Sequence, residues 1–328
     1  MPMVSVTFDV ADIADDPAGG AAFALTHISD PHISCISKIR FGELLGKRFF
    51  GYLKWRLHRG AEHSDSVLSA LHHDLADTKP DHIAVTGDLT HLSLPAEFRK
   101  TRQWLESLGS PDNVTVIPGN HDTYVKTDWQ QTLAHWCDYM LADGANRGEN
   151  PASGFDSIFP SLRVRGRIAL IGVCTALPTA PHLAVGTMGR QQLQKLETLL
   201  AETAAGDLFR VLLIHHPPTP GTVSWRKRLT DAPALQALLA RYGSELVLHG
   251  HAHKSDLGKL ATPNGHVPVI GMPSASARGH TAQSQARYVT YHITRRSSGW
   301  HVRLAVRTYS PDKNRFIVEH EHPFSPMP

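Results

Sequence analysis

The chain has 328 residues, which is ample for a sizeable core, and its formal net charge of +3 with neutral histidines is too small to indicate a nucleic-acid partner by itself. Its three cysteines, Cys35, Cys137 and Cys174, form no CxxC pair, so free thiols in a reducing compartment are the simplest interpretation. The absence of a recognisable signal peptide and of any run of 18 apolar residues argues against a secreted or membrane-spanning chain and predicts a cytoplasmic protein.

Residues 1–22 form a lead-in, in which 4–8 could be an edge strand and 11–22 a flexible Ala/Gly/Asp run. Strands and helices alternate from residue 23 onward. In the first half the sequence predicts strands and helices in turn, at 24–29 (strand), about 62–77 (helix), 82–86 (strand), 95–108 (helix, closed by Gly109), 113–117 (strand) and roughly 126–142 (helix).

The second half begins with a Gly/Asn/Pro-rich loop at 143–160 and ends in a strand-rich part. Between them we expect a hairpin of 161–165 and 167–174 through Gly166, a helix over 188–202, a strand at 210–214, a helix at 232–241 and a strand at 245–248. Strands at 267–270, 288–294 and 300–309 follow. This order predicts an α/β protein, one domain over 23–328, with two facing sheets flanked by helices.

Polar segments with chemistry-bearing side chains follow five of the predicted strands. These segments are Asp30-Pro31-His32, Gly87-Asp88, Gly119-Asn120-His121-Asp122, His215-His216 and Gly250-His251-Ala252-His253. Open α/β sheets place their ligands at the carboxyl ends of strands. The five segments together therefore predict a metal site at that edge of the fold.

The first segment places a carboxylate and an imidazole two residues apart. If it is extended, Asp30 and His32 point the same way, and Pro31 favours that conformation. A single Asp-x-His would more often be ordinary surface. Asp88 has two interpretations, a carboxylate shared between two metals or a cap for the next helix.

The third segment is the most specific of the five. Asn120 offers a neutral carbonyl oxygen to a hard cation. His121 can protonate a leaving oxygen, and Asp122 can fix its tautomer and raise its basicity. The alternative is an Asx-rich turn between a strand and a helix. In the last segment, His251 and His253 repeat the i, i+2 spacing of a ligand pair.

These motifs, in this order, resemble the calcineurin-like metallophosphoesterase superfamily, whose pattern runs DxH, GD, GNHD, H and GHxH. The resemblance covers about residues 23–275. It implies an α/β/β/α sandwich of two sheets flanked by helices, with a dinuclear metal site at the strand carboxyl ends. The resemblance assigns seven metal ligands, Asp30, His32, Asp88, Asn120, His215, His251 and His253. It makes Asp88 the bridge and leaves His216 lining the site as a substrate-binding residue.

The implied mechanism uses two divalent ions. The mixed N/O ligand set suits manganese, iron and zinc alike, and manganese is the favoured metal. The two ions would acidify a bridging water, and the resulting hydroxide would attack phosphorus in line. His121 would donate a proton to the leaving alkoxide, which makes His121 and Asp122 the expected catalytic residues.

The motifs of this chain differ from those of several branches of the superfamily, and these differences indicate which subfamily it resembles. The motif GDLT, followed by Glu97, GNHD and HHPP, resembles the pattern of class III phosphodiesterases, which hydrolyse cyclic nucleotides and glycerophosphodiesters. Protein Ser/Thr phosphatases of the superfamily have GDxxDRG and GNHE instead. Bacterial UDP-diacylglucosamine hydrolases usually have Arg at the place of His121. The DNA-end nucleases are longer and contain coiled-coil insertions, whereas no heptad run occurs here.

A basic, aromatic insertion occupies about residues 38–60. Between Lys38 and Arg59 it has seven Lys/Arg residues against the single Glu43, with five aromatic residues among them. This composition suits an element at an anionic membrane interface, or a wall over the substrate. It equally suits a cap helix packed on the domain or on a second subunit. Gly42, Gly46 and Gly51 weaken a continuous helix.

The insertion also resembles, more weakly, one in phospholipase C-type metallophosphoesterases of bacterial lipid remodelling. We therefore expect a metal-dependent phosphoric diester hydrolase acting on phospholipids or related lipid phosphodiesters, cytoplasmic and peripheral to the inner membrane surface. The alternative is a soluble cyclic-nucleotide or glycerophosphodiester phosphodiesterase. A scaffold without catalysis would have lost His121 or several ligands. Nucleic acid is not an expected partner, and a homo-oligomer is left open.

Overall fold

The computed structural model describes residues 22–35, 39, 41–44, 46–55, 62–145, 154–263, 265–279 and 281–324. The predicted edge strand in the lead-in, and the insertion residues 36–38, 40, 45 and 56–61, lie outside this range. None of the described helices is both long and apolar enough to cross a lipid bilayer.

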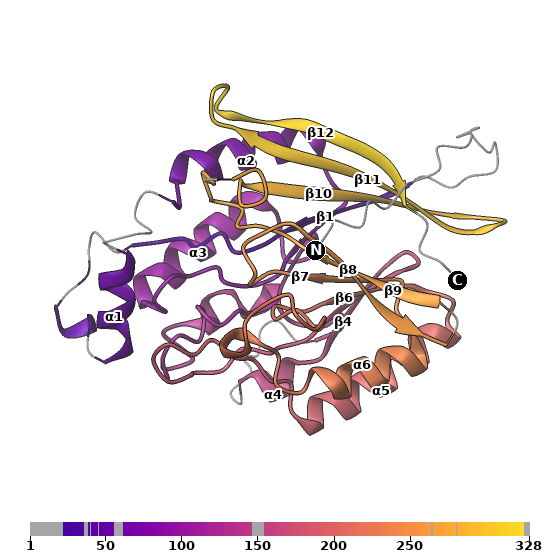
Figure 1. Cartoon of the computed structure of the whole chain (residues 1–328), viewed down its shortest axis with the longest axis horizontal. Coiled ribbons are helices and arrows are strands. Elements are labelled where there is room, and N and C mark those ends of the chain that lie inside the picture. The colour runs from indigo at the N-terminus through magenta and orange to yellow at the C-terminus, as the bar shows by residue number, and fades with distance from the viewer. Residues whose placement is uncertain are drawn as a thin grey trace.

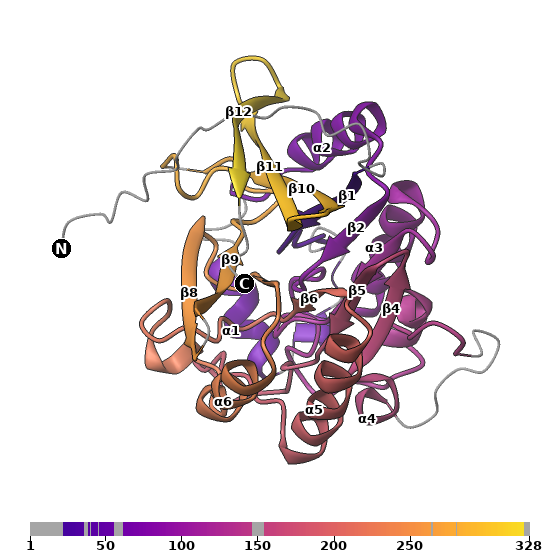
Figure 2. The ribbon, with the colours of Figure 1, turned by 90° about the vertical axis from the view of Figure 1, so that its right-hand side faces the viewer.

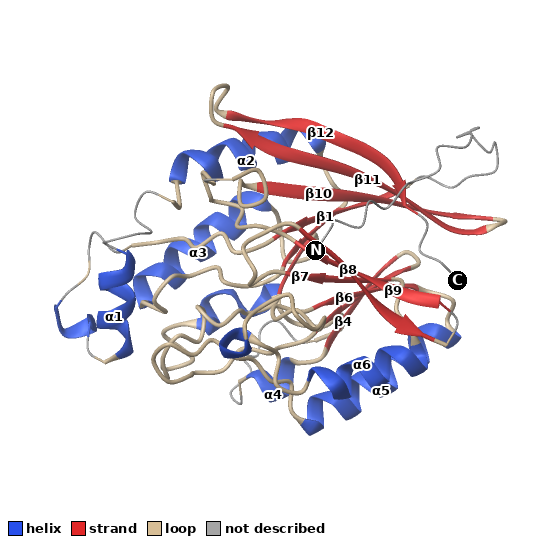
Figure 3. Cartoon of the chain, in the orientation of Figure 1, coloured by secondary structure: helices blue, strands red, loops and turns tan. Residues whose placement is uncertain are grey.

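The fold consists of two six-stranded mixed sheets that face each other (Figures 1 and 3). One sheet has the order β12-β11-β10-β1-β2-β3, made of β1 (Phe23–Ile28), β2 (His82–Val85), β3 (Val114–Val116), β10 (Arg287–Arg296), β11 (Gly299–Ser310) and β12 (Arg315–Phe324). The other has the order β4-β5-β6-β7-β9-β8, made of β4 (Ser161–Arg165), β5 (Ile168–Gly172), β6 (Phe209–Leu213), β7 (Leu246–His249), β8 (Asp256–Thr262) and β9 (Gly265–Gly271).

Helices cover the outer face of each sheet, so the predicted α/β/β/α sandwich is confirmed (Figure 2). α2 (Asp65–Thr78) and α3 (Pro95–Leu108) lie on the first sheet, and α5 (Arg190–Ala205) and α6 (Ala232–Tyr242) on the second. The sequence explains their ends, since Ser64 caps α2 through the backbone N–H of Ser66, and Gly109 follows the last residue of α3.

Short helical segments complete the fold. They are η2 (Phe41–Leu44), α1 (Lys47–Lys54), η4 (Leu133–Tyr139), α4 (Phe155–Ile158) and η5 (Trp225–Lys227). Gly46, at φ 68°, separates η2 from α1, as the glycines in the insertion predicted. Gly51, however, lies inside α1, because its missing side chain lets the helix approach Leu92 and Tyr124.

The core lies mainly between the sheets. Apolar side chains of both inner faces meet there, among them Leu25, Leu170, Val211, Leu213 and Leu248. A second cluster packs the other face of the second sheet against α5 and α6 through residues such as Leu196, Leu200, Leu235 and Leu239. The predicted core-facing stripe of the helix at 188–202 is therefore confirmed.

The structure overturns one predicted element and adds two strands that the sequence analysis did not predict. The helix at 126–142 is wrong, because the structure has turns and the 3₁₀ segment η4, kinked at Trp136. Asp128 and Thr132 bind the local backbone there, which competes with helical hydrogen bonds. The strands β8 and β12 were missed, because their many charged and polar residues hide the alternating pattern of an edge strand.

The carboxyl ends of parallel strands from both sheets meet at one edge of the sandwich. β1, β2 and β3 are parallel to one another, as are β6 and β7. Backbone hydrogen bonds join the loops that follow them, from Asp30 N–H to the Gly87 carbonyl (3.0 Å) and from Gly250 N–H to the His215 carbonyl (3.2 Å). Across the sheets, His215 Nδ1 lies 2.7 Å from the Thr86 carbonyl oxygen. The five polar segments therefore share one edge, as predicted.

Candidate metal centre

The backbone turns sharply at the predicted ligands. Positive φ angles occur at five of them, namely Asp30 (51°), His32 (45°), Asp88 (54°), His251 (67°) and His253 (53°). The left-handed conformation costs a non-glycine residue about 1–2 kcal/mol, and strained residues of this kind gather at functional sites. The expectation that Asp30-Pro31-His32 is extended is wrong. Tight turns, not an extended strand, aim these side chains at one another.

Four of the predicted ligands form a first cluster. Asp30, His32, Asp88 and His253 each offer one nitrogen or oxygen atom, and these atoms lie within 4.8 Å of one another. His253 Nε2 is 3.2 Å from Asp30 Oδ1 and 3.0 Å from His32 Nε2. Nitrogens this close, beside a carboxylate, can hold a single cation.

A second cluster adjoins the first and shares Asp88 with it. Asp88, His215 and His251 also place one donor atom each within 4.8 Å of one another. His215 Nε2 lies 3.2 Å from Asn120 Oδ1 and 3.4 Å from Asp88 Oδ1, whereas Asp88 Oδ2 lies 4.0 Å from His32 Nε2. The two oxygens of Asp88 therefore face different clusters, which is the arrangement that a bridging carboxylate requires.

The imidazoles are held in ligand-ready orientations. In addition to the contact of His215 with Thr86, His32 Nδ1 lies 3.2 Å from the Thr90 carbonyl oxygen and His251 Nε2 lies 3.0 Å from that of Lys227. A ring nitrogen that donates to a carbonyl leaves the other nitrogen with a free lone pair, which is the tautomer that metal ligands use.

Asp30 provides a test of whether divalent cations fit here. Its Oδ2 accepts hydrogen bonds from Ser29 Oγ (2.6 Å) and the His251 backbone N–H (3.1 Å), but its buried Oδ1 has no hydrogen-bond partner. Burying a carboxylate oxygen without compensation is costly. A cation held between Asp30 and His253 would remove that cost, so the donor atoms of the first cluster fit a divalent ion.

The electrostatics of the centre are consistent with cation binding. Burial lowers the pKa of His32 and His251 well below the ordinary range, which keeps both rings neutral. Burial opposes ionisation of Asp88, but the surrounding imidazoles, His215 foremost, outweigh it and hold the pKa of this carboxyl low. Burial would likewise lower the pKa of His215, but Asp88 raises it to about 9. A metal ion would replace the His215 proton.

Asp122 does not set the tautomer of His121. His121 Nδ1 instead lies 2.6 Å from the His91 carbonyl oxygen. The fully buried Asp122 carboxylate accepts hydrogen bonds from the backbone N–H groups of Leu89, Thr90 and Gly119. The prediction failed because a backbone carbonyl leaves no signal in the sequence. Asp122 ties the second and third motif loops together.

His216 does not line the site either. Its Nδ1 lies 2.7 Å from Thr175 Oγ1 and its Nε2 lies 3.2 Å from the Ala184 carbonyl oxygen, so both ring nitrogens are engaged in the interior. Its ring packs against that of His251 with a centroid separation of 4.3 Å. The predicted substrate contact of His216 is therefore wrong. Its ring instead packs against the candidate metal ligand His251.

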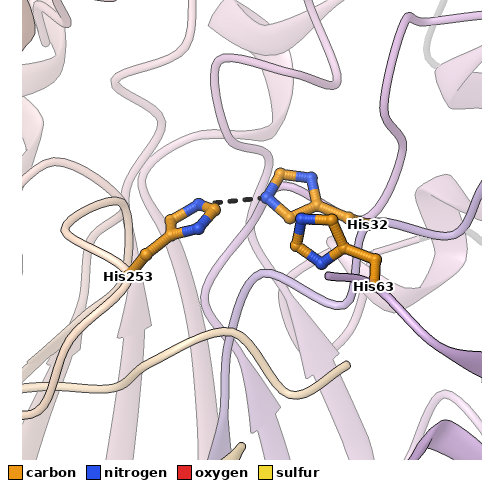
Figure 4. Close-up of side chains that lie close together, drawn as sticks. All are labelled: His32, His63 and His253. Carbon is orange, nitrogen blue, oxygen red and sulfur yellow. Dashed lines mark hydrogen bonds between the residues drawn. The ribbon is translucent and has the colours of Figure 1, made fainter. Parts of the chain in front are cut away.

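Two histidines near the centre were missed by sequence analysis. The ring of His63 lies 4.6 Å from that of His32, and Figure 4 shows it beside the His32–His253 pair. The ring of His91 lies 5.4 Å from that of His121. His63 precedes α2 and follows no strand, so only the tertiary structure brings it here. His91 stands three residues after Asp88, a proximity that could have revealed it among 22 histidines.

A cavity of about 620 Å³ opens over the centre. Its floor includes five residues of the motifs, Asp88, Asn120, His121, His251 and His253. Its walls come from α1 (Lys47, Phe50, Gly51 and Leu53), from Tyr124, from the loop 181–184 and from residues 224–227, which include η5. The described part of the basic insertion is therefore a wall of the cavity, one of the roles expected for it.

The chain is similar to phosphodiesterases over part of its length. A probable cyclic nucleotide phosphodiesterase of Synechococcus is 28% identical over 191 residues, covering 57% of this chain and 63% of the relative. A glycerophosphodiester phosphodiesterase of Enterobacter lignolyticus is 26% identical over 201 residues, covering 60% of this chain and 57% of the relative. The aligned regions thus span about six tenths of the length of each relative.

Among solved structures, a dimetal phosphatase from Danio rerio superimposes with a TM-score of 0.57, covering 91% of this chain and 99% of that one. At 12% identity this likeness shows the fold alone. Residues 23–255, which contain all five motif segments, match the family described as calcineurin-like phosphoesterase. The chain belongs to the calcineurin-like phosphoesterase family.

Proposed function

We propose that this chain is a dinuclear metal-dependent phosphodiesterase that hydrolyses phospholipids or related lipid phosphodiesters. The observation that supports the proposal most strongly is the cavity, which has residues of both clusters on its floor and a basic, aromatic helix in its wall. Family membership supports the phosphoesterase chemistry, and the wall supports the lipid substrate.

Asp30, His32 and His253 would hold one divalent ion, Asn120, His215 and His251 the other, and Asp88 would bridge them. Bound there, the ions would polarise phosphoryl oxygens and lower the pKa of water between them. Manganese, iron and zinc all suit nitrogen and oxygen donors, and manganese stays our preference.

His121 is the proposed proton donor to the leaving oxygen. Its ring lines the cavity, and the Nδ1 contact with the His91 carbonyl leaves Nε2 to carry the transferred proton. Its backbone N–H donates to Asp88 Oδ1 over 2.7 Å. One residue thus serves two purposes, because the ring acts on the substrate and the backbone steadies the bridging carboxylate.

Lys47 is the proposed contact for the substrate phosphate. Its ammonium lies 2.8 Å from Thr179 Oγ1 and 4.3 Å from the centre of the Tyr124 ring, at the wall of the cavity. The Tyr124 ring in turn stacks on His121. Phe50 and Leu53 of the same helix line the cavity with apolar surface. A charged group beside apolar walls matches a phosphodiester attached to an acyl chain.

The second candidate is a soluble cyclic-nucleotide or glycerophosphodiester phosphodiesterase. The activities by which the relatives are named favour it, and a cavity of about 620 Å³ has the size of a small-molecule site.

Phosphorus NMR of the manganese-loaded protein distinguishes the two candidates. The protein is incubated separately with phosphatidylcholine mixed micelles and with cyclic AMP, and Asp88→Asn serves as the inactive control. Phosphocholine released from the micelles, with cyclic AMP intact, is the expected result. AMP released while the micelles stay intact would overturn the lipid assignment, and no product from either substrate would count against both candidates.

A further inference from the structure

The outer face of α1 exposes apolar side chains that a monomeric soluble helix would bury. Phe49 is 51% exposed, Phe50 53% and Leu53 43%. These three residues occupy one side of the helix, whereas Tyr52 and Trp55 on the opposite side pack on the cluster around Leu92. The helix is thus already anchored to the domain by one face, and within the described part of the chain its second apolar face is largely exposed.

A second element exposes an aromatic residue near the same cavity mouth. Trp225 in η5 is 63% exposed, and the guanidinium groups of Arg226 and Arg228 lie 5.5 and 5.8 Å from its ring centre. Ser224, Arg226 and Lys227 line the cavity that Phe50 and Leu53 line from α1. Four of the seven large exposed apolar side chains among the described residues therefore belong to these two elements.

The charge of both elements has one sign. The sequence of α1, Lys47–Lys54, contains three basic residues and no acidic residue, and the segment 222–230 contains Arg226, Lys227 and Arg228 and no acidic residue. Exposed aromatic side chains next to unbalanced Lys and Arg are typical of surfaces that bind anionic lipid head groups and insert shallowly below them.

Both elements are fixed to the candidate metal centre. The Lys227 carbonyl oxygen contacts His251 Nε2 at 3.0 Å. Arg48 Nε donates to the Leu92 carbonyl (3.0 Å), in the loop that follows Asp88. A surface that bound at α1 and η5 would therefore cover the mouth of the cavity in a defined orientation.

We propose that α1 and η5 form a two-part docking face for an anionic lipid bilayer around the mouth of the cavity. The inference deepens the proposed function and rests on it for the nature of the substrate. Membrane contact had been expected of the insertion alone, whereas η5 comes from a segment some 170 residues later in the chain. In this arrangement a lipid head group reaches the metal centre while its acyl chains stay at the interface.

Flotation with lipid vesicles tests the docking face. The metal-loaded full chain is mixed with vesicles of phosphatidylcholine containing 30% phosphatidylglycerol, and with vesicles of phosphatidylcholine alone. Phe49→Ser and Trp225→Ser remove exposed aromatic side chains that do not line the cavity. Val318→Ser is the matched control, because Val318 is 49% exposed on β12, at the edge of the first sheet.

The expected result is binding to the anionic vesicles that weakens about tenfold for each aromatic residue removed, on the scale of burying one such side chain. Added salt should weaken it further, and Val318→Ser should leave it unchanged. The proposal is overturned if the wild type fails to float, or if it binds neutral vesicles equally well. An equal loss in the Val318→Ser variant would also overturn it, and so would retention on DNA without vesicle binding.

Hydrolysis of the soluble diester bis(p-nitrophenyl) phosphate separates this inference from the proposed function. Phe49→Ser and Trp225→Ser should hydrolyse it at the wild-type rate. If the wild type floats but hydrolyses no phosphodiester, the proposed function is overturned and the docking face is retained. If the wild type hydrolyses micellar phospholipid without floating, the docking face is overturned and the proposed function is retained.

Discussion

At the scale of single residues, side chains supply the donor atoms of the metal centre, and the backbone orients these side chains. The side chains of Asp30, His32, Asp88 and His253 converge, whereas backbone carbonyls fix the imidazole rings. The consequence is that a side chain can be replaced without moving its neighbours wherever the backbone makes the supporting contact.

His121→Ala should therefore lower kcat for a phosphodiester by about 10²–10⁴-fold, the usual contribution of a positioned general acid, while both metals stay bound. The backbone N–H that contacts Asp88 remains in the variant. Steady-state kinetics combined with metal analysis of the same preparation checks this. A parallel loss of metal would mean that the His121 ring is a structural support and not the proton donor.

Lys47 should give the Michaelis constant of an anionic diester a distinct pH dependence. Burial lowers the pKa of Lys47 to about 8, so its charge is present below pH 8 and is lost as the pH rises through that value. KM should then rise above pH 8 in the wild type and stay flat in Lys47→Arg, because arginine keeps its charge. Lys47→Met should raise KM about tenfold at pH 7. The same rise in Lys47→Arg as in the wild type would remove Lys47 from substrate binding.

At the scale of elements, the attachment of α1 depends on close packing at Gly51. A Cβ atom there would lie 2.6 Å from Leu92 Cδ2 and 2.8 Å from the Tyr124 hydroxyl. Leu92 is fully buried and cannot move aside. Two effects compete in Gly51→Ala, a gain in helix propensity of about 0.5–1 kcal/mol and an overpacking cost of about 1–3 kcal/mol.

The overpacking cost should prevail, so that Gly51→Ala loosens α1. Hydrogen exchange of the amides at 47–55 should then become faster than in the wild type. Gly42→Ala is the control, because no atom lies within 4 Å of its Cβ position, and it should leave the exchange unchanged. Unchanged protection in Gly51→Ala would show that α1 is not held by this contact.

The start of α3 contains a buried carboxylate that makes stability depend on pH. Glu97 accepts hydrogen bonds from the backbone N–H groups of Leu92 (2.9 Å) and Leu94 (3.0 Å), yet burial raises its pKa from 4.5 to about 7. The folded state thus binds more protons than the unfolded state between these pH values. Its stability should fall as the pH rises from 4.5 to 7, by up to about 3 kcal/mol.

Glu97→Gln should remove this slope. Relative to the wild type, its melting temperature should increase by several degrees between pH 5 and pH 8, as thermal unfolding at each pH would show. Glu106→Gln, on the exposed side of the same helix, should show no such trend. A difference between Glu97→Gln and the wild type that stays constant with pH would contradict a raised pKa.

At the scale of the whole molecule, the sequence analysis correctly predicted the features that short stretches of sequence determine. Apolar strands followed by Asp88, Asn120 or His251 were visible directly, and so was the α/β alternation that leads to two facing sheets. Contacts between distant segments were not visible. His63 approaches His32 only through the tertiary fold, and His216 turns inward because Thr175, from another loop, engages it.

The same limit explains the cavity wall. Composition alone left the basic insertion between a membrane element, a lid and a cap, since α1 becomes a wall only through its packing on Leu92 and Tyr124. The contribution of η5 has no sequence signal beyond a tryptophan among basic residues. Such features require a structure, because they depend on which segments meet.

Metal stoichiometry measured together with diester hydrolysis tests the central claim most directly. The wild type should bind two divalent ions per chain, whereas Asp88→Asn, which lacks the shared carboxylate, should bind one or none and lose at least about a hundredfold in hydrolysis. Asp77→Asn, an exposed substitution on α2, should match the wild type. A fully active wild type with at most one ion per chain, or an Asp88→Asn variant with two ions and full activity, would contradict a dinuclear centre bridged by Asp88.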